Sequence, residues 1–152
     1  MKFTLNGKVV EKDVPPNLTL LNFLRDNLQL TSPKVGCDEG ECGTCTVLLN
    51  GEPVNSCLML AVQVENQEVT TLEGLEANGN LDVVQQTFMD NFGSQCGFCT
   101  PGMILAAKSL LDRNPSPTKE QIKEALEGNL CRCTGYQQII ESVLKAAELR
   151  VT

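Results

Sequence analysis

The stretch GSQCGFCTPGM, residues 93–103, places two cysteines three positions apart immediately before a predicted helix. Thr100 is suited to cap the N-terminus of that helix, and the proline after it to be a first helical residue, where a missing N–H group costs nothing. A second arrangement of this kind follows in CRCTGY, residues 131–136, where Thr134 comes directly after two cysteines and Gln137 can complete a capping box. The sequence therefore predicts two pairs of cysteines, each placed at the start of a helix.

These two pairs can form one metal centre if the two helix N-termini converge. The N-terminus of a helix carries positive partial charge, so it stabilises thiolates and the net negative charge of an iron–sulfur cluster. The pattern indicates a cluster bound by four thiolates. The expected ligands are Cys96, Cys99, Cys131 and Cys133.

A second cysteine motif lies in the first half of the chain, in GCDEGECGTC, residues 36–45. Its Cys-x4-Cys-x2-Cys spacing is that of plant-type ferredoxins, which bind a [2Fe–2S] cluster. The three glycines of the motif let a short loop wrap around a cluster and direct backbone N–H groups at its sulfurs. A strand over residues 46–49, a tight turn at Asn50-Gly51 and a return strand then lead to a fourth thiol. The expected ligands are Cys37, Cys42, Cys45 and Cys57.

The segments around this loop predict a small sheet. Residues 2–14 alternate as a hairpin around Asn6-Gly7, and residues 69–72 form a last strand. Between them, Thr19 can cap a short helix over residues 20–27, which has an apolar leucine face. A mixed sheet that grasps one helix is the fold expected for this part of the chain.

The strand periodicity ends near residues 76–80, which are rich in Asn and Gly. Four helices are predicted beyond this point: one begins near Leu81, one follows Cys99, one has a Thr118–Gln121 capping box, and the last begins near Gly135. Short antiparallel helices joined by tight loops are typical of a bundle. The fold class is therefore α+β, with one domain over residues 1–76 and a four-helix domain over residues 77–152.

Composition limits the possible functions. The chain has 152 residues, a formal net charge of −7, eight cysteines and no histidine. An acidic chain with few aromatic residues is a poor binder of nucleic acid. No apolar run approaches the roughly 18 residues of a membrane span, and no secretory signal opens the chain, so we expect a cytoplasmic protein. Without histidine the commonest general base is missing, and we expect no catalytic residue on this chain.

Two other interpretations of the cysteines stay open on these grounds. Structural zinc sites also use Cys-x2-Cys pairs, which would make the chain a zinc-stapled interaction module. A freestanding two-cluster ferredoxin that serves many partners is the other. Disulfide bonds are disfavoured because they belong to oxidising compartments.

Three blocks of the sequence together identify a family. They are GCDEGECGTC at residues 36–45, QCGFCTPG at residues 95–102 and GNLCRCTGY at residues 128–136. On these blocks the chain resembles the small iron–sulfur subunit of the molybdenum hydroxylases, the xanthine dehydrogenase and aldehyde oxidoreductase family. The resemblance extends over nearly the whole chain, and no cysteine departs from the ligand pattern.

The resemblance implies a β-grasp ferredoxin-like domain that holds an outer [2Fe–2S] cluster and a four-helix domain that holds an inner one. It also implies that the inner cluster lies nearer the molybdopterin cofactor of a large partner subunit. By position, Gln95 would hydrogen-bond the pterin, and Cys133 would lie beside it while binding iron.

As the family implies, the complex would hydroxylate an aldehyde or an N-heteroaromatic substrate, and electrons would leave through the two clusters. The acceptor would be FAD on a medium subunit, where one exists, or an external molecule. The chain has no room for the molybdenum or flavin domains, so we expect them on separate chains. The substrate pocket belongs to the large subunit, and this sequence does not name the substrate.

Overall fold

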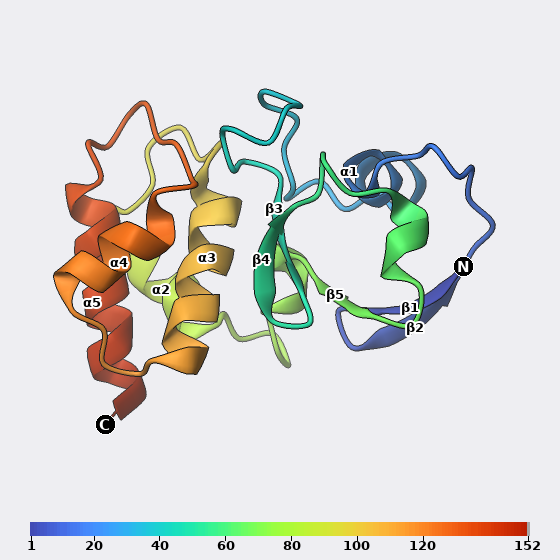
Figure 1. Ribbon diagram of the computed structural model, residues 1–152. Coiled ribbons are helices and arrows are strands. Elements are labelled where there is room, and N and C mark those ends of the chain that lie inside the picture. The colour runs from blue at the N-terminus through green and yellow to red at the C-terminus, as the bar shows by residue number, and fades with distance from the viewer. Residues whose placement is uncertain (152) are drawn as a thin grey trace.

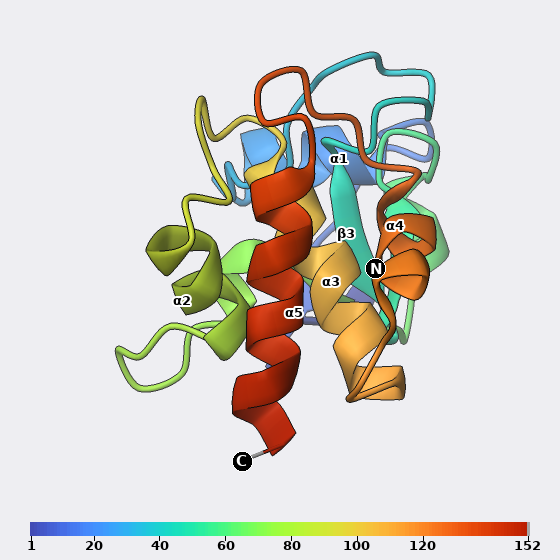
Figure 2. The ribbon, with the colours of Figure 1, turned by 90° about the vertical axis from the view of Figure 1, so that its left-hand side faces the viewer.

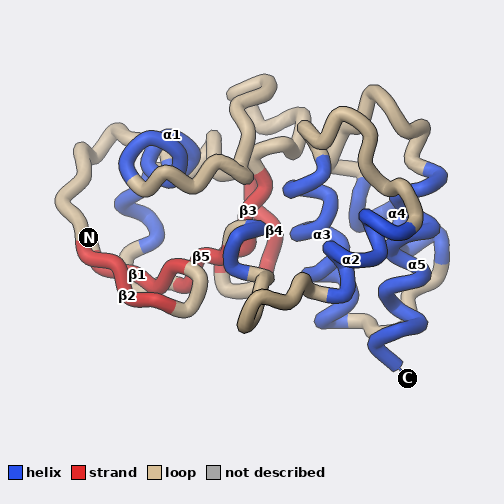
Figure 3. Tube along the Cα trace, turned by 180° about the vertical axis from the view of Figure 1, so that it is seen from behind, coloured by secondary structure: helices blue, strands red, loops and turns tan. Residues whose placement is uncertain are grey.

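The computed structural model describes residues 1–151. A five-stranded mixed sheet forms the N-terminal half, and most of the α-helical structure lies in the C-terminal half (Figures 1 and 3). The strand order is β2-β1-β5-β3-β4, in which β1 and β5 are parallel and the other neighbours antiparallel. The strands are β1 Lys2–Leu5, β2 Lys8–Glu11, β3 Thr46–Leu49, β4 Glu52–Asn55 and β5 Glu68–Thr70.

Both hairpins have the tight turns that the sequence predicts. At Asn6-Gly7 the φ angles are +51° and +75°, and at Asn50-Gly51 they are +51° and +86°. Two successive positive φ values belong to the turn whose twist matches that of the flanking strands, and Asn-Gly adopts them most readily. The sequence therefore sets these two strand pairings locally.

One helix packs against the sheet. It begins as α1, Leu20–Asn22, and continues as the π-helical turn η1, Phe23–Asn27. The side chain of Thr19 accepts a hydrogen bond from the N–H of Asn22, so the predicted cap is confirmed. The leucine face is buried as expected, and Phe23 packs against Phe3 of β1 with ring centroids 6.0 Å apart.

Two 3-10 turns, one before β5 and one after it, precede the helices of the C-terminal half. The turns are η2 Ala61–Val64 and η3 Leu72–Gly74, and the helices are α2 Val83–Asp90, α3 Thr100–Arg113, α4 Lys119–Leu126 and α5 Gln137–Val151. The predicted capping box of Thr118 and Gln121 starts α4. An equivalent box of Asp82 and Gln85, which was not predicted from the sequence, starts α2.

Two of the predicted caps are wrong. Thr100 lies inside α3 rather than before it, and its hydroxyl donates to Ser94 instead of capping the helix. Thr134 lies three residues before α5, because Tyr136 has a φ of +69° that a helix cannot continue through. The Thr134 hydroxyl contacts the thiol of Cys131 and accepts a hydrogen bond from the N–H of Tyr136, which precedes α5.

The helix α3 joins the two halves (Figure 1). It contacts β3 and β4 on one side and α2, α4 and α5 on the other. Accordingly most of its residues are buried, and Ser109 donates a hydrogen bond to the carbonyl of Gly51 in the β3–β4 turn. Figure 2 shows α5 lying over α3, with α2 and α4 on either side. Among residues 1–151, no helix has both the length and the apolar character required to cross a membrane.

Candidate metal centres

The loop of residues 36–45 directs several backbone N–H groups at one thiol. The amides of Glu39, Glu41 and Cys42 lie 3.5, 3.3 and 3.3 Å from the sulfur of Cys37. Hydrogen bonds from the Glu39 and Cys42 amides lower the pKa of Cys37 from 9.0 to about 7. A thiolate is the form that binds metal, so the loop prepares this sulfur as a ligand.

Glycine is required in this loop for two reasons. Gly43 has a φ of +68°, which other residues adopt only with strain. A Cβ atom on Gly36 would lie 2.5 Å from the hydroxyl of Thr44 and 2.7 Å from the sulfur of Cys42. The expectation that glycines allow the loop to close tightly around its thiols is consistent with this geometry.

The other two cysteines of this group are buried. Cys45 and Cys57 are 3% and 7% exposed and pack beside Leu21. Burial, together with the neighbouring thiol of Cys45, raises the pKa of Cys57 to about 11. A bound cation would lower the pKa of both thiols, because it stabilises their charged thiolate form.

The second group comes from two segments that are distant in the sequence. Residues 93–99 and 128–136 lie at the same end of the molecule as residues 36–45 (Figures 1 and 2). Burial and the adjacent thiol of Cys131 raise the pKa of Cys99 to about 12. The thiol of Cys96 lies beside that of Cys133 and raises its pKa as well. The four cysteines that the sequence predicts to converge are thus brought together.

Cys131 is the thiol of this second group that its surroundings favour as a thiolate. Burial raises its pKa, but several hydrogen bonds, first among them those of the Thr134 hydroxyl and N–H, together lower it more, so that the net pKa lies below its ordinary value. The N–H of Thr134 is 3.4 Å from the sulfur, and the hydroxyl 3.1 Å. The hydroxyl that was expected to cap α5 serves the cysteine instead.

The outward side of this second group is open. Cys96 and Cys133 are exposed, as is Gln95 next to them. No hydrogen bond joins the Gln95 side chain to another residue within 1–151. Two apolar side chains close by in the sequence, Phe92 and Phe98, are 77% and 45% exposed.

The donor set suits [2Fe–2S] clusters. All eight cysteines are free thiols, and soft thiolates with N–H groups directed at the sulfurs are the ligands these clusters use. Among the described residues, no three Cys, Asp or Glu side chains are arranged as ligands of a single metal ion. Sequence reasoning missed Asn129, which is buried between the two halves; its partners lie too far away along the chain for any local pattern to indicate them.

Two family models match the chain almost end to end. The model described as 2Fe-2S iron-sulfur cluster binding domain matches residues 3–70, and the model described as [2Fe-2S] binding domain matches residues 71–144. The nicotinate dehydrogenase small FeS subunit of Eubacterium barkeri is 51% identical over 97% of this chain and 94% of its own length. A probable xanthine dehydrogenase subunit of Bacillus subtilis is 43% identical over 95% and 83%. The chain belongs to the small iron–sulfur subunits of the molybdenum hydroxylases.

Solved structures agree with this assignment. In quinoline 2-oxidoreductase from Pseudomonas putida 86, a chain that is 43% identical superposes with a TM-score of 0.94, over 97% of this chain and 93% of that one. The aldehyde oxidoreductase from Desulfovibrio desulfuricans, also 43% identical, gives 0.95 over 99% of this chain but only 17% of its own. This small iron–sulfur subunit is thus an electron-transfer component of an oxidoreductase, with two [2Fe–2S] centres, and its fold is the ferredoxin-like α+β fold of the family.

Proposed function

We propose that each group of four cysteines holds one [2Fe–2S] cluster. The ligands of the outer cluster are Cys37, Cys42, Cys45 and Cys57, and those of the inner cluster are Cys96, Cys99, Cys131 and Cys133. The observation that carries this assignment is that one thiol in each group accepts hydrogen bonds that favour its thiolate form. Cys37 accepts them from three backbone amides, and Cys131 from Thr134. Each cluster supplies a site that accepts and releases one electron.

The protein's own contribution is to hold these sulfurs and to shield them unequally. Two thiols of the outer group, Cys45 and Cys57, are buried, whereas Cys37 and Cys42 on the loop are partly exposed. The inner group is open at Cys96 and Cys133. We propose that the large molybdopterin-binding subunit covers this open side. Cys133 would then lie beside the pterin, and Gln95, which has no partner within residues 1–151, would hydrogen-bond it.

We propose further that the complex hydroxylates an N-heteroaromatic compound. The relatives that match as separate small chains include subunits named for nicotinate, caffeine and nicotine. In the aldehyde oxidase 2 of Cavia porcellus, the matching region is 46% identical and makes up only 11% of a longer chain. An aldehyde substrate is the alternative. The electron acceptor would be FAD on a medium subunit or an external molecule.

The domain assignment follows the same division. We propose an outer domain over residues 1–76 and an inner one over residues 77–152, in which α2, α3, α4 and α5 form a four-helix bundle. A shared apolar core that includes Val84, Leu111 and Ile139 supports the bundle. We place the complex in the cytoplasm, as the sequence predicts.

Purification of the native complex under anaerobic, iron-replete conditions tests this function. We expect a red-brown assembly that contains a larger molybdopterin-bearing chain, with two iron and two sulfide ions for each cysteine group. A chain that purified alone with both clusters would instead be a freestanding ferredoxin. A colourless chain with stoichiometric zinc and no acid-labile sulfide would overturn the cluster assignment.

A further inference from the structure

The two cysteine groups are joined directly by the backbone of their own loops. The N–H of Leu130 donates to the carbonyl of Cys42 over 2.9 Å. Leu130 immediately precedes Cys131, so this one hydrogen bond connects a proposed outer ligand to the neighbour of a proposed inner ligand. The distance between the two groups is therefore governed by whatever fixes segment 128–131 against segment 42–46.

Asn129 fixes these two segments. Its side-chain amide donates to the carbonyl of Gly43 at 2.9 Å and to the hydroxyl of Thr46 at 3.1 Å, both in the other half of the chain. The residue is only 6% exposed. Since a carbonyl oxygen only accepts hydrogen bonds, the amide nitrogen must be the atom that faces it. A buried amide that satisfies two acceptors at once allows little sliding between the segments.

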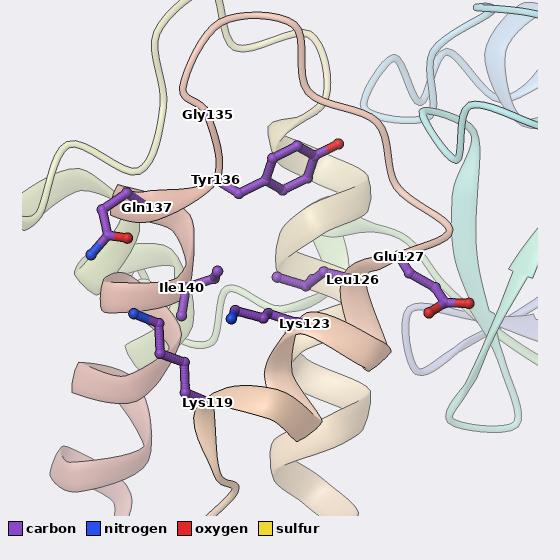
Figure 4. A pocket seen from close by; sticks show the side chains of 8 residues that line it. All are labelled: Lys119, Lys123, Leu126, Glu127, Gly135, Tyr136, Gln137 and Ile140. Carbon is purple, nitrogen blue, oxygen red and sulfur yellow. The ribbon is translucent and has the colours of Figure 1, made fainter.

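Tyr136 holds Asn129 from the other side. Its hydroxyl donates to the carbonyl of Asn129 at 3.2 Å and accepts from the N–H of Cys131 at 2.9 Å. Figure 4 shows its ring lining an open cavity of about 360 Å³ between α4 and α5, with the hydroxyl end toward the segment after α4. The position of Cys131 is thus tied to the same residue that grips the outer loop.

The contact between segments 42–46 and 128–131, called the seam below, is tightly packed. A Cβ atom on Gly43 would lie 2.2 Å from the carbonyl of Gly128, and one on Gly102, in α3, would lie 2.5 Å from the carbonyl of Gly43. Both values are far inside van der Waals contact. The backbones are thus so close that no side chain fits between them, and a displacement of one loop is transmitted to the other.

We propose that Asn129 is a positioning residue that sets the distance between the two clusters. The proposal rests on the ligand assignment above and adds to it a role for a residue that binds no iron. Electron transfer and the magnetic interaction between two paramagnetic centres both weaken as the centres move apart. A small shift of segment 128–131 therefore changes a measurable property even when both clusters are intact.

The test uses the full-length chain with both clusters, reduced chemically and examined by paramagnetic resonance. Asn129→Ala removes both donated hydrogen bonds, and Asn129→Leu removes them while keeping the side-chain size. Asn91→Ala is the matched control, because the Asn91 amide also donates to a backbone carbonyl, but to that of Thr87 one turn earlier, at the C-terminal end of α2. Deuterium exchange of the segment containing Leu130 provides an independent readout.

We expect both Asn129 variants to retain two reduced clusters, with weaker spin–spin splitting between them than in the wild type. Exchange of the Leu130 segment should be faster by about 5- to 150-fold, the effect of two lost hydrogen bonds on a local opening equilibrium. Asn91→Ala should match the wild type in both readouts. If an Asn129 variant loses its inner cluster, Thr46→Val, which removes one acceptor and leaves segment 128–133 unchanged, should show a partial loss of splitting.

Two failures are distinguishable. A wild-type chain that cannot be loaded with two clusters overturns the ligand assignment itself. Two intact clusters with unchanged splitting and unchanged exchange in the Asn129 variants and in Thr46→Val overturn only the positioning role.

Discussion

The outer and inner cysteine groups are built in different ways. In the outer group three thiols lie within ten residues, and backbone amides of the same loop point at Cys37. In the inner group the thiols come from two segments, residues 96–99 and 131–133, and two of the four are exposed. The outer group thus depends mainly on local chain geometry, and the inner group on how α3 and α5 pack.

The two groups also differ in exposure. The outer group has two buried and two partly exposed thiols, whereas the inner group has two exposed ones and can be completed by another protein surface that covers them. Exposed Cys96 and Cys133 next to an unpartnered Gln95 are arranged for such a completion. The comparison therefore predicts that damage to one group leaves the other able to assemble.

The largest effect is expected from loss of one ligand. Cys99→Ser should abolish the inner cluster, because a hydroxyl oxygen replaces a soft thiolate poorly. The outer cluster should still assemble, since its proposed ligands lie in a different part of the chain, residues 37–57. In the complex, a strong chemical reductant should then reduce the outer cluster while substrate does not, as paramagnetic resonance can show.

The mirror variant, Cys42→Ser, is the control. It should leave the inner cluster reducible by substrate but prevent delivery to the final acceptor. Rapid reduction of the outer cluster by substrate in a complex shown to lack the inner one would falsify the proposed order.

A second, smaller effect is expected at the seam between the groups. Gly43→Ala and Gly51→Ala both place a side chain at a positive φ, +68° and +86°. Only at Gly43 does the added Cβ collide with backbone, 2.2 Å from the carbonyl of Gly128, whereas nothing lies within 4 Å of it at Gly51. Gly51→Ala should cost about 1 kcal/mol in unfolding free energy, and Gly43→Ala about 1–3 kcal/mol more.

Chemical denaturation of both variants measures this difference. Equal destabilisation by the two substitutions would show that the loops have room to separate, and that the tight contact does not hold the two halves together.

A third effect concerns the open side of the inner group. Gln95→Ala should keep both clusters, because the side chain has no hydrogen bond within residues 1–151. It should weaken docking of the molybdopterin subunit or slow substrate-driven cluster reduction, by about 0.5–1.5 kcal/mol for one lost hydrogen bond. Unchanged binding and reduction in the variant complex would make Gln95 an ordinary turn residue.

The smallest effect is expected at Glu73, which ties the turn before α2 to the start of the outer loop. Its carboxylate accepts hydrogen bonds from the N–H and hydroxyl of Ser32 and from the hydroxyl of Thr71. Desolvation raises its pKa, but these bonds lower it more, so the net pKa lies below the ordinary 4.5. Glu73→Gln should therefore lower the stability of the protein by about 1 kcal/mol or less near neutral pH.

The pH dependence of this stability difference tests whether the pKa of Glu73 is lowered in the folded protein. A depressed pKa means that the carboxylate stabilises the fold above the unfolded value, and that this contribution is lost as the pH falls through the folded pKa. The difference between wild type and Glu73→Gln should thus be constant from pH 8 to 6 and shrink below 4.5. A gap that widened on acidification would contradict the assignment.

The sequence alone determined the features that depend on neighbouring residues. The Asn-Gly turns, the Thr19 cap and the Thr118–Gln121 capping box were predicted correctly, because each is decided within a few positions. The Cys-x4-Cys-x2-Cys loop belongs with these, since its amides and thiols lie within one short segment. The family was indicated by the resemblance of three sequence blocks, residues 36–45, 95–102 and 128–136, to its small iron–sulfur subunits.

Only the tertiary structure decided the features that depend on distant partners. The sequence predicted Thr134 as a helix cap, but its hydroxyl contacts Cys131. The positive φ of Tyr136 is not helical, so α5 begins only after that residue. Asn129 lies within the block GNLCRCTGY, but its partners could not be found from the sequence, because the groups it binds are 86 and 83 residues away. Local propensity acts over a few residues, whereas a buried amide gains its energy from whatever acceptors the fold brings to it, and for that reason the seam between the two cysteine groups could be found only in the folded chain.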